Sequence, residues 1–145
     1  MSSANREAEE IYFAVYQQLA LNAEYMQSTS VKRLLPEVVI AAALGAVFQA
    51  VFNSLAHGFF ARFGEQAADY VSEKVRNWSA AGKSPEQIVA AIEESLPVIR
   101  RSDVNWEEIA GRITPELTRL GLALPVSQKV AVEVCRILRN KSAAS

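Results

Sequence analysis

The sequence has few of the residues that bind metals or form covalent bonds. It contains one cysteine, Cys135, and one histidine, His57, among 145 residues. A lone cysteine excludes an intramolecular disulfide. A zinc site of the Cys/His type, a Cys-His nucleophile pair or a two-histidine haem site would each need residues from another subunit. We therefore predict no metal, no cofactor and no catalytic residue of these kinds.

Glycine-rich phosphate-binding loops are lacking as well. Neither the GxxxxGK[ST] nor the GxGxxG pattern occurs. Neighbouring glutamates such as Glu93 and Glu94 point about 100° apart on a helix, so we interpret them as solvated charge rather than as a catalytic pair. The sequence thus favours a protein that is not an enzyme.

Net charge is also nearly absent, because 15 basic residues stand against 16 acidic ones. Such a balance gives no global field toward nucleic acid or an anionic membrane. One segment, Leu117 to Leu138, is compatible with a helix-turn-helix, although its linker through Pro125 is longer than that motif usually has. Binding of nucleic acid through this segment is our third hypothesis, with Gly121 in the turn and basic residues at Lys129, Arg136 and Arg139.

The sequence begins without the basic and apolar regions of a signal peptide, and with a single cysteine we expect a cytoplasmic protein. Apolar residues make up 50% and charged residues 21%, which excludes a disordered chain. A length of 145 residues suits one core. We expect a single helical domain over residues 1–145.

No β-hairpin signal occurs, whereas helical periodicity recurs almost throughout the chain. The predicted fold class is all-α, a compact bundle of about five to seven helices with a long apolar second helix. We expect helices over about 5–26, 36–57, 65–78, 85–99, 105–113, 114–120 and 127–140.

Several helix ends have local signals. Ser84 to Gln87 is a capping box with proline at the first helical position, and Asn105 to Glu108 offers another. The pair Thr114-Pro115 predicts a new helix start, and Gly121 its end. The last segment has a strand alternative, in which valines alternate with other residues at Val130, Val132 and Val134.

The most unusual segment is Val38 to Ala61, whose 24 residues carry no formal charge. At 100° per residue the large side chains share one arc of a helix, and the opposite arc is small or polar. The large arc holds Ile40, Leu44, Val47, Phe48, Val51, Phe52, Leu55 and Phe59; the small arc holds Ala42, Gly45, Ala46, Gln49, Ala50, Asn53 and His57.

This division predicts a buried or half-buried helix of a soluble bundle, whose small arc lets a second helix approach or meets water. The alternative is a membrane span, because about 20 apolar residues suffice to cross a bilayer. In that case the small arc would be its packing surface.

The leading functional hypothesis is a helical protein-interaction module, a subunit, adaptor or regulator that acts through its helix surfaces. We expect a protein partner or self-association, and the predicted contact residues are Gly45, Gln49, Asn53 and His57. The alternative is a small membrane-associated or membrane-inserting protein that uses Val38 to Ala61.

Overall fold

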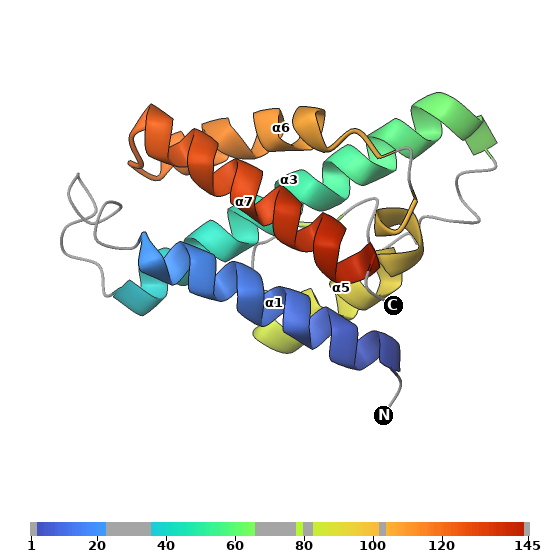
Figure 1. Cartoon of the computed structure of the whole chain (residues 1–145), viewed down its shortest axis with the longest axis horizontal. Coiled ribbons are helices and arrows are strands. Elements are labelled where there is room, and N and C mark those ends of the chain that lie inside the picture. The colour runs from blue at the N-terminus through green and yellow to red at the C-terminus, as the bar shows by residue number, and fades with distance from the viewer. Residues whose placement is uncertain (1–2, 23–35, 66–77, 80–82, 102–103, 144–145) are drawn as a thin grey trace.

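The computed structural model describes residues 3–22, 36–65, 78–79, 83–101 and 104–143 (Figure 1). Within these ranges the chain forms five helices and no strand, so the all-α prediction is confirmed. The helices pack into a bundle in which α3 contacts α1, α5 and α6, while α7 packs against α1 and α6. They are α1 (Ser3–Leu21), α3 (Pro36–Phe63), α5 (Pro85–Ile99), α6 (Trp106–Arg119) and α7 (Leu124–Ala143).

Helix α1 packs against α5. Asn5 Nδ2 donates a hydrogen bond to Glu93 Oε2 at 3.2 Å, and Arg100, the residue after α5, pairs with Glu7. The inward stripe predicted for α1 is confirmed where it is described, since Tyr12 and its neighbours one turn apart are buried. The described helix ends at Leu21 rather than at 26, and residues 23–26 lie outside the described ranges.

Helix α3 supplies the centre of the core, as its large arc predicted. Phe48 and Phe52 stack at 5.7 Å between ring centroids, and Trp78 packs edge-on against Phe52 at 5.1 Å. The helix was predicted to end at about 57 or slightly beyond, at Gly58 or Gly64; it continues through Gly58 to Phe63 and ends just before Gly64, whose φ is +60°. The buried members of the large arc are Ile40, Leu44, Val47, Phe48, Val51, Phe52 and Leu55.

The helix predicted over 65–78 falls mostly outside the described residues, as does Gly82. Its last residue, Trp78, is described and is buried.

The capping box that begins α5 is complete. Gln87 N donates to Ser84 Oγ at 3.3 Å, and Ser84 N donates to Gln87 Oε1 at 2.8 Å. Helix α5 continues through Pro97 and ends two residues later at Ile99, so it spans the predicted range. The predicted inward face of α5 is confirmed, with Ile88, Ile92, Leu96 and Ile99 all buried.

The prediction of a new helix at Thr114-Pro115 is wrong, because α6 continues through Pro115 to Arg119. Proline leaves the carbonyl of residue 111 without its helical donor. Gly111 is exposed, so water reaches that region, and the Thr114 hydroxyl donates to the carbonyl of Ala110 at 2.9 Å. Burial of Ile109, Ile113 and Leu117 along one face holds both halves in a single helix.

Helix α6 ends in a Schellman motif at Gly121. Leu122 N donates to Leu117 O at 3.2 Å, Gly121 N donates to Thr118 O at 3.0 Å, and Gly121 has a φ of 102°. This turn brings α7 back across α6 (Figure 1). The linker is residues 120–123, so the prediction of an over-long linker through Pro125 is wrong.

The strand alternative for the last segment is wrong. Val130 and Val134 are buried while Val132 is 57% exposed, which places alternate valines on different sides of a helix. Helix α7 also begins earlier than predicted, at Leu124, and Ser127 N donates to Ala123 O at 2.8 Å within its first turn.

Candidate interaction surface on helix α3

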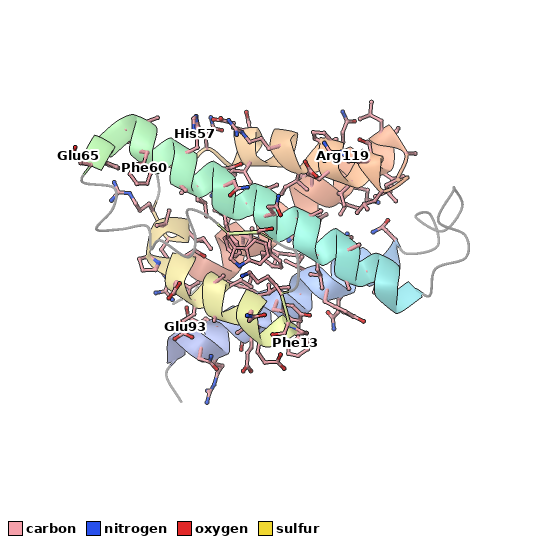
Figure 2. The ribbon with its side chains drawn as sticks, turned by 180° about the vertical axis from the view of Figure 1, so that it is seen from behind. Phe13, His57, Phe60, Glu65, Glu93 and Arg119 are labelled. Carbon is pink, nitrogen blue, oxygen red and sulfur yellow. The ribbon has the colours of Figure 1, made fainter. Side chains whose placement is uncertain are left out.

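Helix α3 has one face that the described parts of the chain leave largely uncovered. Figure 2 shows α3 crossing the front of the molecule, with α6 along one side and α5 along the other. We define the outward face of α3 by its exposed and half-buried residues in the predicted small arc, which carry no charge. They are Ala42, Ala46, Gln49, Ala50, Asn53 and His57.

The structure places three of the four predicted contact residues on this outward face. Asn53 and His57 are exposed, and Gln49 is half-buried. Gly45 is buried and does not share the surface. At 100° per residue Gly45 lies at the edge of the small arc, next to the large side chains that face the core. This position around the helix axis explains why it is buried.

The C-terminal half of the outward face opens into a shallow depression. Asn53, Ala56, His57 and Phe60 of α3 line it, together with Arg112 of α6. Figure 2 shows His57 and Phe60 near one end of α3, with His57 on the side where α6 lies. The depression therefore depends on two helices, and the sequence pattern of α3 predicts only one side of it.

The depression offers several hydrogen-bonding groups beside an aromatic ring. An asparagine amide both donates and accepts, an imidazole does so when neutral, and a guanidinium only donates. Arg112 is oriented by Glu108, since its Nη2 donates to Glu108 Oε1 at 3.2 Å. Such a set can donate hydrogen bonds to, and accept them from, the polar groups of another molecule.

Arg112 and Phe60 were not predicted as contact residues. In the sequence Arg112 belongs to a run of alternating charges, Glu108, Arg112, Glu116 and Arg119, whose spacing predicts surface ion pairs. Two of those pairs form in α6, Arg112 with Glu108 and Arg119 with Glu116. Nothing local to either helix indicates that Arg112 also borders α3.

The lone cysteine lies elsewhere. Cys135 is buried in α7, and burial raises the pKa of its thiol to about 12. The thiolate is the nucleophilic form of cysteine, so this side chain is unreactive at neutral pH. In the ranges described, no three His, Cys, Asp or Glu side chains come together as metal ligands do.

Helix α3 is also long and apolar enough to cross a membrane over Ile40–Phe63, by length and composition alone. The core helix of a soluble bundle passes the same test, and 56% of the apolar window is buried against the rest of the molecule.

Comparison with known proteins adds no relative. No protein-family model matches the chain, and no curated protein or solved structure gives a match.

Proposed function

We propose that the chain is a non-enzymatic helical protein-interaction module, and that its partner binds the outward face of α3. The observation that carries this proposal is an uncharged strip on the surface of a protein in which 21% of residues are charged. The cores of protein interfaces are depleted in charged residues. Small side chains such as Ala42 and Ala46 let a partner helix approach closely.

Other exposed apolar groups are weaker candidates. Phe13 on α1 is 59% exposed and Val132 on α7 is 57% exposed. Both have charged neighbours on the same helix, for example Glu9 and Glu10 on α1 and Arg136 on α7, all exposed. Isolated exposed apolar residues are common on soluble proteins and need no partner.

A second candidate is association with a membrane through α3, favoured by the length and composition of that helix. Among the side chains that the structure describes on α3, the exposed ones are small or polar, whereas Leu44, Phe48 and Phe52 are buried in the bundle. Lipid contact through the large side chains would require α3 to leave the bundle. The interaction module needs no such rearrangement, so it is our first choice.

A site-specific photo-crosslinking experiment tests the proposal. A photoreactive amino acid replaces Asn53 on the outward face in one variant and Gln128, exposed on α7, in a control variant. In the cells that make the protein, we expect one adduct of defined mass at position 53 and none at position 128. A second copy of the chain would give an adduct of twice the mass.

The substitution Ala42→Glu places a charge on the same face at an exposed position, so the fold should tolerate it. It should reduce the adduct at position 53 at least five-fold. Equal adducts at positions 53 and 128, or an adduct that Ala42→Glu leaves unchanged, would contradict the proposal.

A further inference from the structure

The side chains on the outward face of α3 are graded in size along the helix. The N-terminal half has the alanines Ala42 and Ala46, and the C-terminal half has the longer polar side chains of Asn53 and His57. All four are exposed or half-buried. The positions on this face are symmetric about the point midway between residues 49 and 50. A second α3 that runs in the opposite direction about that point gives three kinds of pair, which are Ala42 with His57, Ala46 with Asn53, and Gln49 with Ala50.

This symmetry favours an antiparallel pair of α3 helices. In such a pair each longer side chain lies opposite an alanine, so the two helices can approach evenly over the roughly 22 Å between residues 42 and 57. A parallel pair would place His57 opposite His57 and Ala42 opposite Ala42, which would hold the helices apart at one end. The spacing of four, three and four residues along 42, 46, 49 and 53 is typical of helices that pair at a small crossing angle.

Helix α6 supplies an independent match of charge. Arg112 borders the outward face, because it lines the depression together with Asn53 and His57. Figure 2 shows His57 and Arg119 at different points along the side of this surface where α6 lies. The charges at spacings of four, four and three residues share one side of α6 and alternate in sign. They are Glu108, Arg112, Glu116 and Arg119.

An antiparallel pair of α3 helices also determines how the two α6 helices meet. A two-fold axis perpendicular to α3 places α6 beside α6 of the second copy, running in the opposite direction. Reversal of the charged run pairs Glu108 with Arg119 and Arg112 with Glu116, so every pair has opposite signs. A parallel arrangement would place like charges opposite each other, which is unfavourable.

We infer that the partner of the outward face is a second copy of this chain, and that the two α3 helices pack antiparallel about a two-fold axis between Gln49 and Ala50. This inference rests on the proposed function and names the partner at that surface. Both copies use the same patch, as a two-fold interface requires. The sizes on α3 and the charges on α6 select the same orientation.

The first measurement is the oligomeric state of the full chain by sedimentation velocity. One pair of helices with its margins makes a small interface, so we expect mostly monomer near about 1 µM and mostly dimer above about 100 µM. The photo-crosslinked adduct at position 53 should have twice the mass of the chain.

The second measurement exchanges side-chain sizes across the two-fold axis. Ala46→Asn places one amide opposite another and should weaken the dimer about ten-fold, because overpacking at a close contact is unfavourable. Asn53→Ala leaves two alanines opposite each other and should weaken it about three-fold. A chain with both substitutions again has an asparagine opposite an alanine, so its affinity should return to within about two-fold of the unaltered protein.

Gln128→Ala, at an exposed position on α7, is the control and should leave the dimer unchanged. Thermal melts check that each variant stays folded. A double variant that binds more weakly than either single variant would overturn the antiparallel pairing. A dimer that none of the substitutions on α3 weakens would place the interface elsewhere and overturn the inference.

The failure of this inference differs from the failure of the proposed function. A chain that stays monomeric at about 200 µM, well above the range of weak specific dimers, would overturn the second copy as partner. If such a chain still gave an adduct of another defined mass at position 53, the interaction surface on α3 would stand with a different partner. No adduct of any mass at position 53 would overturn the surface and the inference together.

Discussion

Two serines inside helices have opposite hydrogen-bonding states. Ser54 Oγ has no partner, whereas Ser95 Oγ, in a residue only 1% exposed, donates to Ile92 O at 3.0 Å. A hydrogen bond within the protein contributes about 1 kcal/mol net to the free energy of unfolding, whereas a buried hydroxyl group without a hydrogen bond is destabilising. The two residues thus form a matched pair in which the same substitution should have different effects.

We predict that Ser54→Ala leaves the free energy of unfolding unchanged or raises it by up to about 1 kcal/mol. Ser95→Ala should lower it by about 1 kcal/mol. Urea unfolding followed by circular dichroism measures both variants under the same conditions. If Ser54→Ala costs as much as Ser95→Ala, the Ser54 hydroxyl has a partner in solution.

The buried thiol of Cys135 makes stability depend on pH in the alkaline range. Burial raises its pKa from 9.0 to about 12, so above pH 9 the unfolded chain loses this proton while the folded chain keeps it. Its contribution to stability is therefore complete below pH 9 and is lost as the pH rises toward 12. For this one proton, the free energy of unfolding falls by at most about 1.4 kcal/mol per pH unit.

We predict that Cys135→Ser flattens the fall in stability between pH 8 and pH 10, measured by urea unfolding relative to the unaltered protein. The thiol should also react with a disulfide reagent at pH 8 at least 100-fold faster in urea than in the folded state, because only an accessible thiolate attacks. Rapid reaction of the folded protein would show that Cys135 is accessible. An identical pH dependence in Cys135→Ser would contradict the raised pKa.

At the scale of a helix, the two sides of α3 should respond differently to added volume. Gly45 is buried and Ala42 is exposed, although the sequence places both in the small arc. Gly45→Leu gains up to about 1 kcal/mol in helix propensity but inserts a side chain into a packed region, which typically costs about 1–3 kcal/mol. We expect the cost of overpacking to exceed the gain in helix propensity.

The predicted result is a loss of about 1–2 kcal/mol for Gly45→Leu and a change within about 0.5 kcal/mol for Ala42→Leu. Val47→Ala, fully buried on the opposite side, is the control and should cost about 2 kcal/mol. Thermal melts compare the three variants. Equal melting temperatures for both leucine variants would show that Gly45 is not packed.

Helix ends were predictable where the signal is local. The capping box at Ser84 and the stop at Gly121 depend on residues that lie within one turn of each other, so the sequence contains the whole arrangement. The wrong prediction at Pro115 has a local cause, because a proline after a threonine favours a helix start. Burial of Ile109 and Leu117 on either side of it depends on tertiary packing and outweighs that preference.

The candidate surface was likewise predictable only where it depends on a single helix. Asn53 and His57 fall on one face by helical periodicity alone, and the structure exposes both. Arg112 borders α3 because α6 packs against it, and that packing does not follow from the sequence of either helix alone.

At the scale of the whole molecule, the position of α3 separates the two proposed functions. The interaction module keeps α3 inside the bundle against α1, α5 and α6. Membrane insertion would remove it and leave the faces of those helices without their core partner. Trp78 reports on this choice because it is 6% exposed and its ring packs against Phe52 of α3.

We predict that α3 stays in the bundle when lipid is present. In a Trp106→Phe background, Trp78 is the only tryptophan, and its emission should not change when vesicles of phosphatidylcholine and phosphatidylglycerol are added. Brominated lipids should not quench it, and the protein should not float with the vesicles in a density gradient. A red shift would mean that Phe52 has left Trp78, and quenching with flotation would mean that the bundle has opened into the bilayer. Either result would favour membrane association over the interaction module, because α3 cannot present its outward face to a protein partner while its large side chains contact lipid.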